Sequence, residues 1–154
     1  MAWKIGDDIL DTRQIEDLID DLTHRSEHLD DCRDEYIEAM EGDDYSQEDI
    51  DYLHNRYQEA VEDFSVEDAQ LLEDLLRFKD ELEGYCDWDH GETLIHKDYR
   101  EEYAELLAKD YGAISSTPQW PLDHIDWKAA AEELFRHDYT HAEIRGEIYY
   151  ARCY

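Results

Sequence analysis

The chain has 154 residues, and its 44 Asp and Glu outnumber its 14 Lys and Arg, which gives a formal net charge of −30. Such a charge argues against nucleic acid and anionic membranes as direct partners and favours a basic surface on another protein. No run of roughly 18 apolar residues is present, so no membrane helix is expected. Residues 1–8 lack the basic and apolar stretches of a secretory signal, so none is expected.

The first predicted element is one long helix over residues 11–41. Asp11 and Thr12 are candidate N-caps, and Gln14 follows Asp11 at the spacing of a capping box. An apolar seam with one defect at Arg25, widened by Ile19 and Ile37, consists of Ile15, Leu18, Leu22, Leu29, Cys32 and Tyr36. Spacing of this kind predicts packing against another helix.

Residues 42–46 are a predicted turn, and Ser46 with Asp49 caps the next helical segment. A heptad pattern then runs through Ile50, Tyr57, Phe64, Leu71, Phe78 and Tyr85. The second apolar position shifts by one place near Ser65, where Ser65 and Asp68 form another capping-box pattern. Residues 47–84 are therefore one long helix with a stutter or two helices broken near Ser65, and we favour a continuous or kinked helix. In both cases the segment folds back on residues 11–41.

The remaining chain predicts smaller elements. Gly84 ends the helical segment, and a short strand is expected at residues 93–95. Two short helices follow over residues 98–109 and 126–137, and a tight β-hairpin turns at Arg145-Gly146. The predicted fold class is mainly α (α+β): a long antiparallel, coiled-coil-like helical hairpin plus a small C-terminal α+β module ending in a β-hairpin.

The charge is divided unevenly along the chain. Residues 1–84 hold 29 acidic and 7 basic residues, a net charge of −22, whereas residues 85–154 hold 15 and 7, a net charge of −8. We therefore expect two domains, an acidic helical hairpin over 1–84 and a small α+β module over 85–154. Cys32, Cys86 and Cys153 are odd in number and widely spaced, which favours a reducing cytoplasm over a disulfide framework.

The acidic residues of the first helix are dense enough to be compared with phosphates. Residues 11–41 hold twelve of them. A helix of that length spans roughly 45 Å, so there is about one negative charge per 4 Å. A single DNA strand carries one per about 3.4 Å. Ordinary coiled coils mix Glu with Lys to gain pairing, but only Arg13, Arg25 and Arg33 offset this helix.

These carboxylates predict a partner-binding acidic face. Its predicted members are Asp20, Asp21, Glu27, Asp30, Asp31, Asp34, Glu35, Glu38, Asp43, Asp44, Glu59, Glu62, Asp63, Glu73, Asp74 and Asp80. Nucleic-acid mimicry is the interpretation we favour. The alternatives are halophilic solvation and an acidic scaffold of other purpose.

No convincing catalytic or metal-binding pattern occurs. His24 and His28 lie one turn apart, but the stretch reads HRSEH and not HExxH. The loop from Cys86 to Glu92 holds several potential ligands, yet it fits a calcium loop poorly because position twelve from Asp87 is Asp98. His137 and His141 are expected at a helix end. We therefore expect no enzyme, no cofactor and no metal; a metal-dependent enzyme using the Cys86–Glu92 loop is the weakest alternative.

The C-terminal part carries a family resemblance. Its motifs are Gly91-Glu-Thr-Leu-Ile95, Asp110-Tyr-Gly-Ala-Ile114, Trp120-Pro121, residues 125–134, Asp138-Tyr139-Thr140 and the hairpin with Tyr149-Tyr150. Over roughly residues 88–152 the chain resembles small acidic phage and prophage proteins, and it is similar to the C-terminal part of ArdA-type antirestriction proteins. Those are dimeric DNA mimics that block type I restriction enzymes. The helical hairpin of residues 1–84 does not match their architecture.

The resemblance and the acidity together predict a function. We expect a DNA-mimic inhibitor from a phage or mobile element, acting in the host cell cytoplasm. Its partner would be a basic DNA-binding host defence protein of a restriction, CRISPR or similar system, from which it would exclude DNA. A homodimer is compatible with this prediction. The alternative is an acidic structural or oligomerisation scaffold without DNA mimicry.

Overall fold

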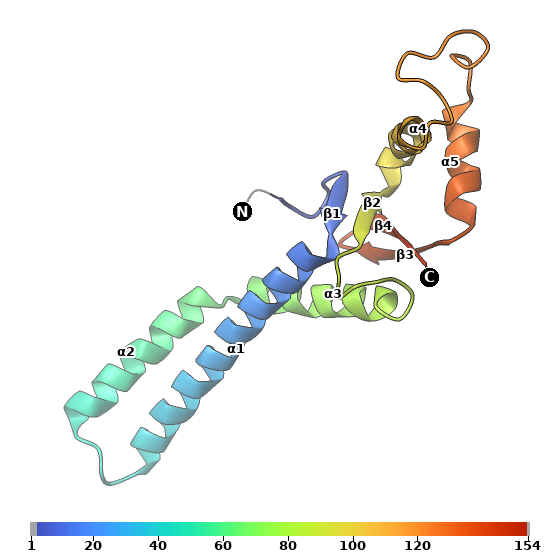
Figure 1. Cartoon of the computed structure of the whole chain (residues 1–154). Coiled ribbons are helices and arrows are strands. Elements are labelled where there is room, and N and C mark those ends of the chain that lie inside the picture. The colour runs from blue at the N-terminus through green and yellow to red at the C-terminus, as the bar shows by residue number, and fades with distance from the viewer. Residues whose placement is uncertain (1–2, 154) are drawn as a thin grey trace. The chain divides into compact units, whose positions relative to one another are not determined.

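The computed structural model describes residues 3–153 and has the expected fold class (Figure 1). It is mainly helical, with a four-stranded antiparallel sheet that ends in a β-hairpin. Internal packing defines two compact units. Residues 15–76 form the hairpin unit, whereas residues up to Gln14 and those from Arg77 onward form the sheet unit. The domain boundary expected at residue 84 thus falls within the sheet unit.

Two long helices form the hairpin: α1 (Thr12–Glu41) and α2 (Gln47–Asp63). The N-terminus of α1 is capped as expected, because Gln14 Oε1 accepts the Asp11 N–H at 2.8 Å and Asp11 Oδ1 accepts the Arg13 N–H at 2.8 Å. At the start of α2, Ser46 and Asp49 form the expected reciprocal capping box. Both caps satisfy N–H groups that a helix leaves without an internal partner.

The expectation of a continuous helix over residues 47–84 is wrong. α2 ends at Asp63, and α3 (Val66–Leu82) begins two residues after Phe64, which has φ −129° and ψ 89°. Ser65 Oγ accepts the Asp68 N–H at 3.2 Å, and Asp68 Oδ2 accepts the Ser65 N–H at 3.0 Å. This capping box satisfies the first N–H groups of a new helix and thereby stabilises a break.

The apolar seam of α1 is confirmed over most of its length. Ile15, Ile19, Leu22 and Cys32 are buried, and Leu18, Leu29 and Tyr36 are half-buried. Ile37 is 43% exposed, so it does not widen the seam as expected. Arg25, the apparent defect, donates from Nη1 to the Asp63 carbonyl at 2.8 Å. It therefore satisfies a carbonyl at the end of α2, which a helix terminus otherwise leaves unpaired.

The sheet has the strand order β1-β2-β4-β3, and all neighbours are antiparallel. The strands are β1 (Ile9–Asp11), β2 (Thr93–His96), β3 (Tyr139–Ile144) and β4 (Glu147–Arg152). The expected strand and hairpin are confirmed. Arg145 and Gly146 both have positive φ, as a two-residue hairpin turn requires. β1 was not expected, because three residues carry too little pattern to identify a strand.

Helices cover one face of this sheet. A short 3-10 helix, η1 (Lys97–Tyr99), leads into α4 (Arg100–Asp110), and α5 (Trp127–Arg136) follows a long loop. Both α-helices were expected, and Ala104, Ala131 and Phe135 pack with Ile95 of β2. On the opposite face of the sheet, Tyr149 of β4 contacts Phe78 of α3 edge to face, with ring centroids 6.2 Å apart. The sheet is thus buried on both faces, and the core of this unit lies around it.

Candidate protein-binding surface of the helical hairpin

The hairpin unit holds most of the charge of the chain. Residues 15–76 contain 23 acidic residues and three arginines, a net charge of −20. Each arginine is engaged by a carboxylate: Arg25 with Asp21 at 2.9 Å, Arg33 with Asp30 at 3.2 Å and Arg56 with Glu35 at 2.7 Å. Because the arginines are held by the unit's own carboxylates, they do not offer unpaired positive charge to a partner.

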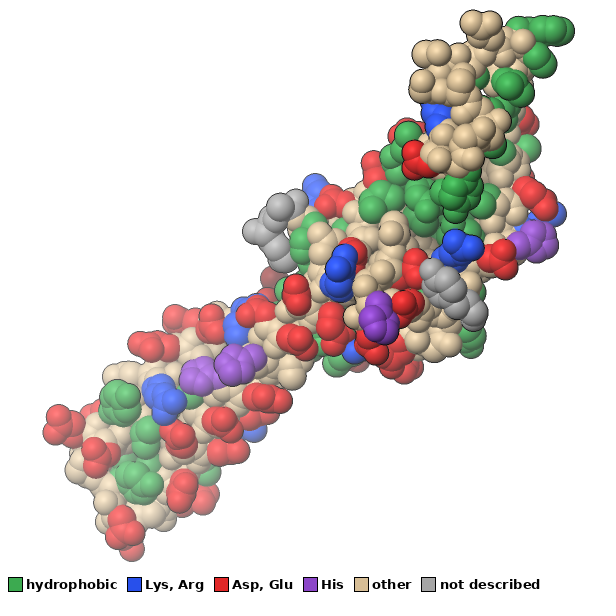
Figure 2. All heavy atoms as spheres, viewed as in Figure 1, with side chains coloured by type: hydrophobic (Ala, Val, Ile, Leu, Met, Phe, Trp, Pro, Cys, Tyr) green, Lys and Arg blue, Asp and Glu red, His purple; other side chains and the backbone are tan. Residues whose placement is uncertain are grey.

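One side of the hairpin, here called the acidic face, collects carboxylates from both helices. The Arg56–Glu35 pair joins α2 to α1 on this side. With 3.6 residues per turn, the α1 residues at multiples of three and four from Glu35 share its side. The exposed carboxylates of the acidic face are Asp17, Asp20, Asp21, Glu27, Asp31, Glu35 and Glu38 on α1 and Glu59 and Asp63 on α2. Figure 2 shows acidic side chains along the whole length of both helices.

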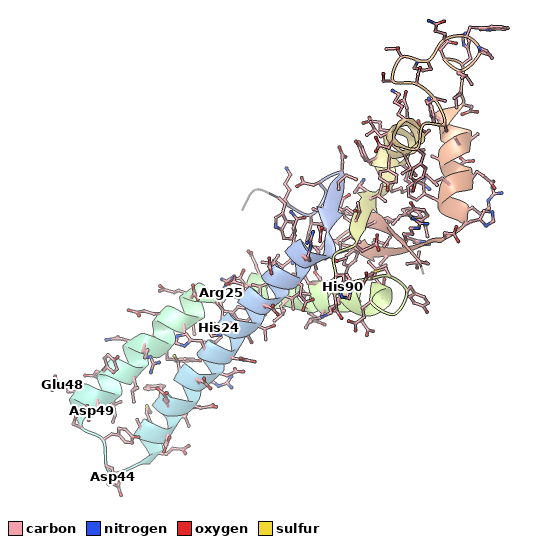
Figure 3. The ribbon with its side chains drawn as sticks, viewed as in Figure 1. His24, Arg25, Asp44, Glu48, Asp49 and His90 are labelled. Carbon is pink, nitrogen blue, oxygen red and sulfur yellow. The ribbon has the colours of Figure 1, made fainter. Side chains whose placement is uncertain are left out.

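A groove crosses the acidic face between the two helices. Its volume is about 590 Å³, and it is lined by His28 of α1 and by Tyr52, Asn55, Arg56, Glu59, Ala60 and Asp63 of α2. His24 and Arg25, one turn before His28 on α1, lie between the helices in Figure 3. The acidic face is therefore two rows of side chains on either side of a depression.

The structure brings together only part of the predicted acidic face. All predicted members are exposed except Asp74, which is half-buried and accepts a hydrogen bond from Gln70 Nε2 at 3.0 Å. The helical period places Asp30, Asp34 and Glu62 at the outer edges of the helices, and Asp21 pairs with Arg25. Asp43 and Asp44 lie in the loop between α1 and α2, where Figure 3 labels Asp44.

Three predicted members are on α3 and not on α1 or α2. Glu73 and Asp74 are on α3, and Asp80, also on α3, belongs to the sheet unit. A continuous or kinked helix over residues 47–84, which the sequence favoured over two helices, would have placed them on the same helix as Glu59 and Asp63. The break at Phe64 removes that reason for a shared face.

The opposite side of the hairpin, here called the apolar face, was not expected. It comprises Arg33, Tyr36, Ile37 and Met40 of α1 and Ile50, His54, Tyr57 and Val61 of α2, with Asp51 at its edge. Tyr36 contacts His54 and Tyr57, with ring centroids 5.1 and 6.0 Å apart. Ile37, Met40 and Val61 are 43%, 57% and 39% exposed. Sorting the acidic residues by the helical period would have revealed this division of the surface.

The residues considered for catalysis or metal binding lie mostly in the sheet unit. In the Cys86–Glu92 loop, burial raises the pKa of the Cys86 thiol to about 11, so the thiol stays protonated at neutral pH. His90 donates from Nδ1 to Asp87 Oδ1 at 2.8 Å, and this hydrogen bond raises the pKa of His90. Within residues 3–153, no three His, Cys, Asp or Glu side chains are grouped so as to hold a metal ion.

Comparison with family models, with curated proteins and with solved structures found no match. The similarity of residues 88–152 to ArdA-type proteins therefore remains a hypothesis from sequence motifs. In the part of the chain that the structure describes, no helix is both long enough and apolar enough to cross a membrane.

Proposed function

We propose that the protein is a DNA mimic that binds the basic DNA-binding surface of another protein and excludes DNA from it. In line with the resemblance of its C-terminal part, the target would be a host defence protein and the source a phage or mobile element. Carboxylates of the acidic face would take the positions of phosphates. The protein would act by occupying the site and would catalyse no reaction.

The observation that carries the proposal is the acidic face and its lack of opposing cations. The hairpin unit has 23 acidic residues, and its three arginines are already paired. Asp20, Glu27, Asp31 and Glu38 have no ion-pair partner among the described residues. Since like charges at helical neighbour spacing destabilise a helix, such an arrangement gives no structural benefit. Binding to a basic surface would provide the missing counter-charges.

The test is competition with DNA on two purified defence proteins, a type I restriction enzyme and a CRISPR effector complex. Each is first bound to a fluorescent duplex, and the protein is titrated in while anisotropy is recorded. We expect displacement of the duplex from at least one of them, weakening steeply as salt rises, as phosphate contacts do. Failure to displace duplex from either protein at low salt would contradict the proposal for these target classes.

A charge-matched pair of variants locates the effect. The first variant neutralises Asp20, Glu27, Asp31 and Glu38 to their amides. The control does the same to Glu101, Glu102, Asp110 and Glu143, exposed residues of the sheet unit. Exposed ion pairs contribute roughly 0–1 kcal/mol each, so the first variant should inhibit about tenfold less well and the control nearly as well as wild type. Equal losses would mean that net charge alone acts.

A scaffold function is the second candidate, and the apolar face favours it. A single layer of two helices leaves apolar side chains in water unless another layer covers them. Two copies that each carry −30 repel one another, and the apolar face is the side of the hairpin where carboxylates are confined to the edge. We therefore propose that a second copy covers this face, with two hairpins forming a four-helix bundle. Such a homodimer is compatible with DNA mimicry and does not require it.

A further inference from the structure

The groove of the acidic face has aromatic rings in its lining. Tyr52 is 66% exposed and lines the groove on α2, while His28 lines it from α1. The His28 ring contacts the buried Cys32, whose Sγ lies 3.6 Å from His28 Nε2. Imitation of phosphates requires only negative charge, so it does not account for an exposed tyrosine between the carboxylates.

The carboxylates at this groove remain available to a ligand. Glu59 and Asp63 are exposed and have no ion-pair partner among residues 3–153. Arg56, the one Lys or Arg in the lining, is held by Glu35 at 2.7 Å. Counting Glu35 with Arg56, the groove keeps two uncompensated negative charges. Asn55 adds an amide oxygen that can accept a hydrogen bond.

A planar cation matches this set of groups better than a compact one. A guanidinium stacks on an aromatic ring and donates hydrogen bonds to carboxylates in its own plane. An ammonium group is a strongly hydrated point charge that gains less from a ring and forms no bidentate pair. The groove, at about 590 Å³, has room for one arginine side chain without displacing the Arg56–Glu35 pair.

We propose that the groove between α1 and α2 is a binding site for an arginine side chain of the basic partner. The guanidinium would stack on Tyr52 and pair with Glu59. Asp63 lies eleven residues beyond Tyr52 on α2, roughly 16 Å along the helix axis, so Asp63 and the surrounding carboxylates would contact other cations less specifically. This inference rests on the proposed function for the identity of the partner, but the groove can be tested without that partner. An arginine site would make the acidic face bind arginine more tightly than lysine, although the two side chains carry the same charge.

The test uses two peptides, hexa-arginine and hexa-lysine, titrated into the full-length protein by calorimetry at fixed salt. A purely electrostatic face binds both alike. Stacking on an exposed ring adds roughly 0.5–1 kcal/mol, or about two- to fivefold in affinity, and bidentate pairing adds to it. We therefore expect hexa-arginine to bind roughly three- to tenfold more tightly than hexa-lysine. Equal affinities would overturn the proposal.

Charge-neutral variants show where the preference arises. Tyr52→Ala should reduce it about two- to fivefold by weakening hexa-arginine binding, and should leave hexa-lysine binding within about twofold. The control Tyr45→Ala removes another exposed tyrosine, outside the groove, and should keep the preference. A preference as large in Tyr52→Ala as in wild type, or an equal reduction in both variants, would contradict the proposal. Because Tyr52 is mostly exposed, a thermal melt should show both variants folded.

The two proposals can fail separately. If hexa-arginine is preferred and Tyr52→Ala reduces this preference, the arginine groove stands even where duplex is not displaced from either defence protein. If duplex is displaced but the peptides bind equally, DNA mimicry stands and the arginine groove is wrong.

Discussion

At the scale of single residues, buried Thr12 joins two segments far apart in the sequence. Its hydroxyl donates to the Trp88 carbonyl at 2.8 Å and accepts the Glu92 N–H at 2.8 Å. Thr12 was expected only as a helix cap, a role that Asp11 fills instead. The threonine fixes the Cys86–Glu92 loop against the start of α1, which gives this loop a structural purpose.

Replacing Thr12 by valine should therefore destabilise the protein. The shape is kept, but the carbonyl and the N–H lose their buried partner, which costs about 1–3 kcal/mol of unfolding free energy. Urea unfolding followed by circular dichroism measures the change. Thr93→Val, at an exposed strand position, is the control and should stay within about 0.5 kcal/mol of wild type. A Thr12→Val protein as stable as the control would show that the hydroxyl contributes nothing net.

The environment of Tyr149 predicts that the protein loses stability at alkaline pH. Its hydroxyl donates to the Asp7 carbonyl and accepts the Gly6 N–H, both at 2.8 Å. Burial raises its pKa to about 12, whereas a tyrosine in an unfolded chain titrates near 10. Above pH 10 the unfolded chain releases this proton more readily than the folded protein does. The contribution of Tyr149 to the free energy of unfolding is therefore complete below pH 10 and decreases between pH 10 and about pH 12.

The free energy of unfolding should fall by up to about 1.4 kcal/mol per pH unit because of Tyr149 alone. Burial also raises the pKa of Tyr139, which adds to the slope. In Tyr149→Phe the protein should be less stable at pH 8 but lose stability less steeply between pH 10 and 12. Urea unfolding at intervals of half a pH unit measures both slopes, and identical slopes would contradict the assignment.

At the scale of elements, the break between α2 and α3 depends on one capping box. Ser65 and Asp68 exchange hydrogen bonds, and Phe64 is buried beside them. Ser65→Ala removes the side-chain acceptor of the Asp68 N–H and should lower stability by about 1 kcal/mol. Ser115→Ala, in an exposed loop, is the control for loss of a hydroxyl and should have no measurable effect. Equal stability of the two variants in urea would mean that the break is set by other contacts.

The apolar face is tested at the same scale by two valines. Val61 belongs to this face, whereas Val66 begins α3 and is 88% exposed. If a second copy covers the apolar face, Val61→Glu should shift the dimer to monomer at micromolar concentration, because a buried unpaired charge opposes association. Val66→Glu adds the same charge and should leave the dimer intact. Sedimentation velocity distinguishes the outcomes, and a wild-type monomer across the range would refute the dimer.

At the scale of the whole molecule, a charge of −30 predicts opposite responses of stability and binding to salt. The Debye length falls from about 30 Å at 0.01 M to about 10 Å at 0.1 M, so added salt screens the self-repulsion of the folded chain. The melting temperature should therefore rise from 0.01 to 0.3 M sodium chloride. Over the same range, duplex displacement should weaken. A melting temperature that falls with salt would show that internal ion pairs outweigh repulsion.

Local signals in the sequence were sufficient to predict most of the helices and the β-hairpin. Capping residues, the seam of α1 and the Arg145-Gly146 turn predict helices and a hairpin because each acts through neighbours within a few positions. Composition alone determined the charge and hence the kind of partner proposed. The capping box at Ser65 was also readable, but the heptads across it suggested continuity, and the local cap prevailed because it satisfies the N–H groups of a new helix.

Only the tertiary structure decided how the surface is divided. Strand β1 exists because β2 pairs with it, and its three residues carry no pattern of their own. Arg56 could be recognised as engaged only once α2 lay beside Glu35 of α1. Which carboxylates share a face, and that an apolar face lies opposite, depends on how the two helices are rotated about their axes. That rotation is set by packing between residues distant in the sequence, which short-range patterns do not specify.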